Sequence, residues 1–191
     1  MILILMGKTA SGKDSIAKEL CRNYQFTRIV TYTTRPPRPN EVEGEDYHFI
    51  SKSDFMDNVK HNFFVEWKGY QSAEGEWFYG TAAEDLNSGG VLILTPLGVR
   101  DFYRYCRCIA RVVYIKASDE TIMNRLTQRG DNPVEAKRRL EHDHEDFDIP
   151  AVNRLADYTV VNEGRTVSDI AEEIVNYWMR EKERIYGTDK Y

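Results

Sequence analysis

The chain has 191 residues, enough for one domain with a sizeable core, and 41% of them are hydrophobic, which is ordinary for a folded protein. Its formal net charge of −5 argues against a general nucleic-acid binder, and no apolar run approaches the length of a membrane span. The short apolar N-terminus lacks the basic leader of a signal peptide, so we expect a cytoplasmic protein with no membrane or nucleic-acid partner. The three cysteines, Cys21, Cys106 and Cys108, are expected to be reduced and mostly structural.

The first predicted elements are an apolar strand at residues 2–6, a glycine-rich turn and a helix from residue 14 to 22. The turn has the Gly-x-x-x-x-Gly-Lys spacing of a phosphate-binding loop, in which backbone N–H groups surround a polyphosphate and the lysine reaches its terminal phosphates. A hydroxyl normally follows the lysine and helps to hold Mg²⁺, but here Asp14 takes that place. The pattern predicts a nucleoside triphosphate site made by Gly7, Lys8, Thr9, Ala10, Ser11, Gly12, Lys13, Asp14 and Ser15.

Later apolar runs predict four more strands, and helical segments separate them. Strands that alternate with helices are typical of a parallel sheet with helices on both faces. We therefore expect an α/β fold of the P-loop NTPase type, with three layers and a five-stranded parallel sheet. The additional strands are expected at residues 28–31, 91–95, 112–116 and 158–161.

Helix signals are clearest in the second half of the chain. Ser118 caps a predicted helix that runs to residue 129, and Pro133 opens another that runs to about residue 146. An amphipathic helix is predicted at 168–184, and the charged residues 180–191 are expected to form a frayed surface tail.

Two segments interrupt the predicted core, which comprises residues 1–32, 83–118 and 149–191 of a single domain spanning 1–191. Residues 33–82 are rich in proline, glycine, aromatic and charged residues, and predict a small insertion with short strands at 47–50, 63–67 and 77–81. Residues 119–148 are charged and helical and carry several arginines, as a lid over phosphates would.

The insertion opens with the run Thr-Thr-Arg-Pro-Pro-Arg at residues 33–38, and Asp-Tyr-His-Phe follows at 46–49. With these motifs the chain resembles the guanylate kinase family, and the resemblance extends over essentially its whole length. It implies a nucleoside monophosphate kinase in which residues 33–82 are the NMP-binding insertion. The implied reaction is in-line transfer of the γ-phosphoryl group from ATP to the phosphate of GMP, or dGMP, with Mg²⁺.

The resemblance also implies roles for individual residues in the acceptor site. A guanidinium group matches a phosphate with two parallel hydrogen bonds, and one carboxylate can accept from both donors on the edge of guanine. Adenine offers an acceptor and a donor on that edge, so a carboxylate such as Glu66 would discriminate against it. The implied GMP-binding residues are Thr31, Arg35, Arg38, Tyr47, Glu66, Tyr79, Gly80 and Thr81.

On the donor side, the resemblance implies that Lys13, Arg125, Arg129 and Arg139 act on the transferring phosphates. Arg138 precedes Arg139, and either could fill the second lid position. Asn162 matches a family segment beside the adenine of ATP, and ATP and GMP are the implied small-molecule partners of a monomer or homodimer.

The chain departs from the family where strand 91–95 ends. The family has an acidic Asp-x-Asp there, and Ile93 and Thr95 stand in its place. We hypothesise that Asp14 restores the lost charge as a metal ligand, since Mg²⁺ accepts hard oxygen ligands from either element. The alternative is that Asp14 only stabilises the first turn of its helix. Residues 69–75 exceed the family's usual spacing and are expected to loop out.

Two other functions stay open at this stage. Ribose 1,5-bisphosphate phosphokinase also has Gly-Lys-Asp-Ser in its loop and lacks the strand acid, but it has no need for the guanine-binding glutamate. Guanylate-kinase-like domains of scaffold proteins bind phosphopeptides without catalysis. The acidic and histidine-rich run at residues 142–146 is expected to be a solvated helix rather than a metal site.

Overall fold

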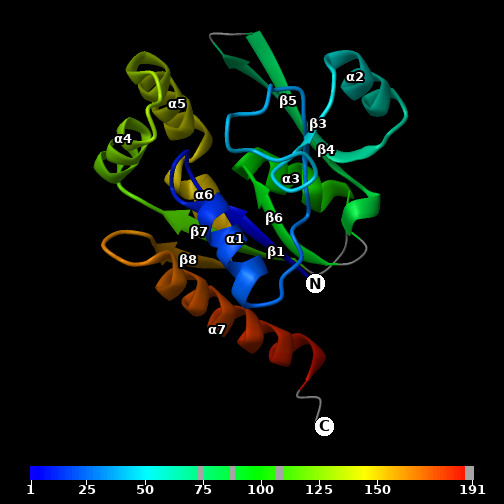
Figure 1. The fold of residues 1–191 in the computed structure, drawn as a ribbon. Helices are drawn as coiled ribbons and strands as arrows, with labels where there is room; N and C mark the ends of the chain where they lie inside the picture. The colour runs from blue at the N-terminus through cyan, green and yellow to red at the C-terminus, as the bar shows by residue number, and fades with distance from the viewer. Residues whose placement is uncertain (73–74, 87–88, 106–109, 188–191) are drawn as a thin grey trace.

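The computed structural model of the chain describes residues 1–72, 75–86, 89–105 and 110–187 (Figure 1). Cys106 and Cys108 lie outside these residues, and Cys21 is a free thiol. The elements of the first half are β1 (Ile2–Met6), α1 (Lys13–Asn23), β2 (Tyr32–Thr33), β3 (His48–Phe49), α2 (Lys52–Lys60), β4 (Phe64–Ser72), β5 (Gly75–Ala82), the 3-10 helix η1 (Glu84–Leu86) and β6 (Gly90–Leu94). Those of the second half are α3 (Pro96–Tyr105), β7 (Ala110–Lys116), α4 (Asp119–Gln128), α5 (Pro133–Asp146), α6 (Ile149–Leu155), β8 (Tyr158–Val161) and α7 (Val167–Tyr186).

The main sheet is parallel, with strand order β6-β1-β7-β8, and helices cover both of its faces (Figure 1). Alternate side chains of β1 enter two different cores, as expected for a strand buried on both faces. Leu3 and Leu5 pack with α1 and α7, whereas Ile2, Ile4 and Met6 pack with α3 and α6. The predicted three-layer α/β architecture is confirmed.

The prediction of five strands is wrong, because the main sheet of the described residues has four. At the expected fifth position, Arg28 forms only an isolated parallel bridge with Val91. Two hydrogen bonds support it, from Ile29 N–H to the Val91 carbonyl at 2.9 Å and from Val91 N–H to the Thr27 carbonyl at 2.8 Å. The chain then leaves the edge and enters a second sheet as β2, so the ladder ends after one pair.

This second sheet is mixed, with order β3-β2-β5-β4, and confirms the short strands expected in the insertion. Its small core stacks Phe55 of α2 on Phe64, with ring centroids 4.5 Å apart. The predicted loop at 69–75 is wrong for the described residues, because β4 and β5 stay paired as far as Ser72 and Gly75. Cross-strand aromatic residues extend the hairpin, since Tyr70 lies opposite Trp77. Residues 73 and 74 of the expected loop lie outside the described residues.

The lid helices begin where the sequence predicts. Ser118 accepts from the N–H of Thr121 at 3.2 Å to cap α4, and Asn132 accepts from Val134 and Glu135 to cap α5. The two helices share a small core of their own, made by Ile122, Leu126 and Ala136. The boundaries drawn between core, insertion and lid stay predictions.

Helix α7 runs farther than expected, to Tyr186, so the prediction of a frayed tail is wrong for residues 180–186. Arg111 of β7 donates to Glu181 at 2.5 Å, which ties the end of this helix to the sheet. Residues 188–191 lie outside the described part of the chain. Within that part, no helix combines the length and the apolar character needed to cross a membrane.

Candidate functional site

The turn between β1 and α1 has the geometry of an anion-binding loop. Gly12 has φ +102°, and a Cβ added there would lie 2.4 Å from Nδ2 of Asn162, so both conformation and space favour glycine. Among the described residues no side chain caps α1, and its first-turn N–H groups stay available to an anion.

Lys13 lies across this loop. Its Nζ donates to the carbonyls of Gly7 at 2.6 Å and Lys8 at 2.7 Å. Burial lowers the pKa of Lys13, although nearby Asp14 and Asp143 act in the opposite direction. The ammonium group is therefore positioned at the loop by two backbone contacts that a phosphate could replace.

Two of the predicted residues, Asn162 and Arg125, donate hydrogen bonds to backbone carbonyls of the loop. Asn162 Nδ2 donates to the Ser11 carbonyl at 2.8 Å. Arg125 donates to the carbonyls of Ala10 and Ser11, each at 3.2 Å, and to that of Asn162 at 2.9 Å. Arg125 thus holds the loop in shape, and its predicted action on phosphates stays a prediction, as does the adenine contact of Asn162.

A cavity of about 310 Å³ joins the loop to the insertion and the lid. This volume lies at the lower end of the range for small-molecule sites. Most predicted site residues line it, namely Gly7, Thr9, Ala10, Lys13, Asp14, Thr31, Arg35, Arg38, Tyr47, Glu66, Tyr79, Gly80, Arg129 and Arg139. The remaining predicted residues lie outside its lining, namely Lys8, Ser11, Gly12, Ser15, Thr81, Arg125 and Asn162.

Glu66 on β4 lines the cavity and forms a buried pair with Thr81 on β5. Thr81 Oγ1 donates to Glu66 Oε1 at 2.5 Å, and both residues are buried. Burial raises the pKa of Glu66 to about 7, against the opposing effect of the Thr81 hydrogen bond. A buried carboxyl group that lines a cavity can accept hydrogen bonds from a ligand bound there.

Arg35 is also buried, and its guanidinium has several partners. Nη2 contacts both oxygens of Glu41 at 2.8 Å, and Nε donates to the Tyr79 hydroxyl at 3.2 Å. Its guanidinium carbon lies 5.5 Å from the ring centroid of Tyr47. Burial raises the pKa of Tyr47, so its hydroxyl stays a neutral donor.

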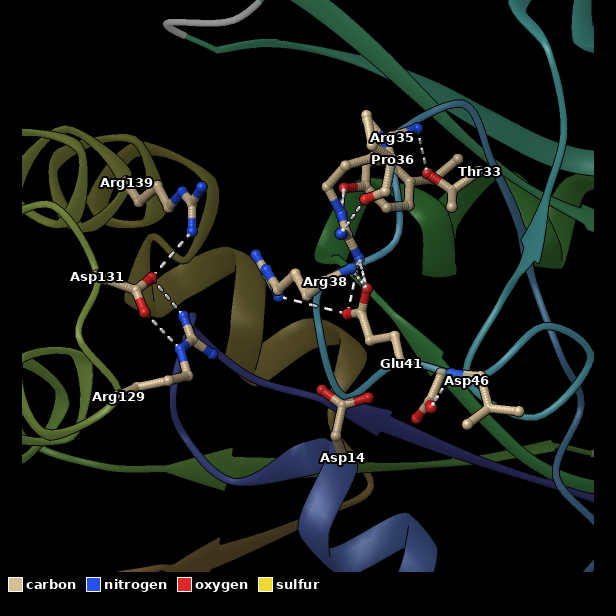
Figure 2. Close-up of polar contacts among 12 residues, drawn as sticks. Asp14, Thr33, Arg35, Pro36, Arg38, Glu41, Asp46, Arg129, Asp131 and Arg139 are labelled. Atoms are coloured by element: carbon tan, nitrogen blue, oxygen red, sulfur yellow. Dashed lines mark hydrogen bonds and ion pairs between the residues drawn. The ribbon is translucent and has the colours of Figure 1, made fainter.

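Arginines of the lid face Arg38 across the space above Asp14, as Figure 2 shows. Arg129 binds Asp131 through two contacts of 2.6 Å, and Arg139 reaches the same carboxylate at 3.3 Å. Burial and the proximity of Arg35 and Arg129 lower the pKa of Arg38. A cluster of this kind attracts an anion with several charges.

Arg138 and Arg139 both line the cavity, and both contact Glu135. Glu135 lies three and four residues before these arginines, so helical spacing alone could have identified their partner. Two other acidic partners were not predicted from the sequence. Glu41 lies three residues after Arg38, and Asp131 lies two residues after Arg129. Tyr70 and Asp143 line the cavity without any local signal, because tertiary packing brings them there.

Asp14 is the predicted metal ligand. Its side chain is 59% exposed, and Oδ1 accepts from Arg28 at 3.0 Å. Mg²⁺ is usually held by one or two carboxylates together with substrate phosphates, so one carboxylate beside this loop fits a bound MgATP. The described residues contain no cluster of three or more metal-binding side chains. Thr95, at the position of the family acid, accepts from the Tyr70 hydroxyl at 3.3 Å.

Sequence comparison finds close agreement with one family over most of the chain. The sequence model described as Guanylate kinase matches residues 1–181. Guanylate kinase of Wolinella succinogenes is 32% identical over 171 residues, which cover 80% of this chain and 76% of that protein. Guanylate kinase of Clostridium tetani is 31% identical over 195 residues, covering 97% and 88%.

Solved structures support the fold alone. A crystal structure of guanylate kinase from Anaplasma phagocytophilum has a TM-score of 0.66 at 22% identity and covers 100% of this chain and 97% of that chain. Shikimate kinase from Acinetobacter baumannii, in complex with shikimate, has a TM-score of 0.52 at 13% identity, with coverage of 94% and 93%. The fold is therefore that of a P-loop kinase.

Proposed function

This chain belongs to the guanylate kinase family, and on that premise we propose that it phosphorylates GMP, or dGMP, to the diphosphate with ATP as the donor. The observation that carries the proposal is the buried carboxyl group of Glu66, which Thr81 holds by a hydrogen bond and which lines the same cavity as the phosphate-binding loop. A family kinase with a different acceptor would have no use for a buried carboxylate facing that cavity.

Guanine presents a ring N–H and an exocyclic amine side by side. The Glu66 carboxylate, once ionised, accepts from both, while Thr81 keeps it oriented. Adenine would place an acceptor against the carboxylate and leave it partly unpaired, which gives strong discrimination. Arg35 and Arg38 bind the phosphate of GMP, and the hydroxyls of Tyr47 and Tyr79 add neutral donors.

Transfer then needs positioning and charge neutralisation rather than a general base. The second pKa of a phosphate monoester is about 6, so the acceptor oxygen is largely deprotonated near neutrality. That oxygen forms a bond to the γ-phosphorus while the bond from the γ-phosphorus to the β–γ bridging oxygen breaks, and ADP leaves. Lys13, Arg129 and Arg139 neutralise the charge that spreads over the transferring group.

When bound with ATP, Mg²⁺ would be held beside Asp14 and would neutralise charge on the β- and γ-phosphates. Closing of the insertion and lid would exclude water, which competes with GMP as an acceptor. The loop residues Gly7–Asp14 and Ser15 would cradle the donor phosphates, with Asn162 near the adenine.

The test follows ADP release with GMP, dGMP, AMP, UMP and ribose 1,5-bisphosphate in turn. We expect rapid turnover with GMP or dGMP and very little with AMP or UMP. Rapid turnover with ribose 1,5-bisphosphate alone would refute the guanylate assignment in favour of the related phosphokinase. Tight GMP binding without turnover of any acceptor would indicate a binding module.

A further inference from the structure

The second lid helix, α5, lies directly on the phosphate-binding loop. The N–H of Thr9 donates to Oδ2 of Asp143 at 2.5 Å. Next to it, Lys8 Nζ donates to Asp119 at 3.0 Å and lies 3.2 Å from Nδ1 of His144. His144 Nε2 is in turn 3.0 Å from Asp119. Two consecutive lid residues therefore hold two consecutive residues of the loop.

The surroundings of Asp143 resemble those of a bound anion. Its side chain is half-buried and lines the cavity, unlike the solvated helix expected for residues 142–146. Lys13 and Lys8 attract its charge, while Asp146 repels it. Burial is the largest influence and raises the pKa of this carboxyl group. A negatively charged oxygen on a loop N–H, close to the loop lysine, occupies the kind of position that a phosphate oxygen takes.

We propose that Asp143 is a built-in competitor of the donor phosphates, because its carboxylate takes the Thr9 N–H that a phosphate oxygen of the nucleotide would use. This inference rests on the proposed function only in assuming that the loop receives a nucleotide polyphosphate. A single N–H cannot serve both partners well, and two anions this close in a partly buried site repel each other. Nucleotide binding therefore requires Asp143 to leave the loop.

The departure of Asp143 has a consequence for the lid. Asp143 lies about one helical turn beyond Arg139 on α5, and Arg138 is on the same helix. Both arginines contact Glu135 in this structure, and moving Asp143 off Thr9 removes a contact that fixes the helix carrying them. Occupation of the loop and placement of the lid arginines are thus coupled through one carboxylate.

Calorimetric titration of the full chain with ADP tests the proposal. Asp143→Ala is expected to bind ADP about tenfold more tightly than the wild type, which corresponds to about 1.4 kcal/mol. The ADP affinity of Asp143→Asn is expected to lie between those of the wild type and Asp143→Ala, because an amide oxygen still accepts from the Thr9 N–H but carries no charge. Glu145→Ala is the matched control, since this acid is on the same helix with its side chain 83% exposed, and its affinity should equal that of the wild type.

Equal or weaker ADP binding by Asp143→Ala overturns the proposal, because a residue that merely positions the loop would weaken binding when removed. If that variant does not fold, Asp143→Asn decides in the same way. Failure of the wild type and of both variants to bind ADP overturns this proposal together with the donor site. If the ADP affinities follow the expected order but the protein does not phosphorylate GMP, the role of Asp143 as a competitor is supported and only the proposed function is refuted.

Discussion

Replacing Glu66 by glutamine tests the proposed acceptor site most directly. The environment of this carboxyl group predicts both how far kcat/KM for GMP should fall and how that fall should depend on pH. Glutamine keeps the size of the side chain and its contact with Thr81, but puts an amide where guanine needs an acceptor. A hydrogen bond to a charged group contributes about 1.5–3 kcal/mol, so kcat/KM for GMP should fall about 10- to 100-fold at pH 8.

The pKa of Glu66, raised by burial to about 7, adds a pH signature. Guanine requires the ionised carboxylate, whose fraction falls from about nine-tenths at pH 8 to about one-tenth at pH 6. Since kcat/KM reports ionisations of the free enzyme and of the free substrate, the phosphate of GMP also contributes, with a pKa of about 6. That contribution is common to wild type and variant, so the wild-type to Glu66→Gln ratio of kcat/KM isolates Glu66.

The assay is coupled ADP release with GMP as the varied substrate between pH 6 and pH 8. We expect the ratio to fall about tenfold towards pH 6, as the wild-type carboxyl becomes protonated. Glu76→Gln is the control, because Glu76 is a partly exposed acid on the same hairpin that contacts Lys52, and this variant should leave the pH profile unchanged. A ratio that stays constant with pH, or a Glu66→Gln enzyme as active as the wild type, would refute this reasoning.

Four further predictions follow from the site. Lys13→Met should lower kcat at least about a hundredfold while calorimetric GMP affinity is kept, and near-normal turnover would contradict its role. Asp14→Asn should raise the Mg²⁺ concentration for half-maximal turnover, and an unchanged dependence would sink the metal assignment. Asn162→Ala should lower the free energy of unfolding in urea by about 1 kcal/mol, because the buried Ser11 carbonyl loses one side-chain donor and keeps Arg125. An unchanged unfolding midpoint would argue against that support. Glu66→Gln should raise the free energy of unfolding at pH 8 but little at pH 5. Because burial raises the pKa of Glu66 to about 7 in the folded state, the wild-type protein loses stability as the pH rises towards that value, and the variant does not. An equal gain in the free energy of unfolding at both pH values would contradict this burial cost.

Local chemistry determined much of this protein from sequence alone. The apolar run of β1 and the glycine spacing after it predict the strand, the turn and the helix, because each depends on neighbouring residues. Ser118 and Pro133 mark the starts of α4 and α5 for the same reason. The Thr-Thr-Arg-Pro-Pro-Arg run predicts an acceptor-binding loop, and most residues predicted to bind the acceptor line one cavity.

Only the tertiary structure decided which distant groups meet. The apolar run at 28–31 has strand character, but the turn of the chain into β2 leaves it a single bridge at the sheet edge. The β4–β5 hairpin extends through aromatic pairs across two strands, which spacing within one strand cannot reveal. Asp14 faces Arg28, and Asp143 reaches Thr9 from the far end of the lid. Local rules act over a few residues, whereas these contacts depend on how the sheet, the insertion and the lid pack together. The sequence could therefore predict that the loop binds phosphate, but not that Asp143 would compete for it.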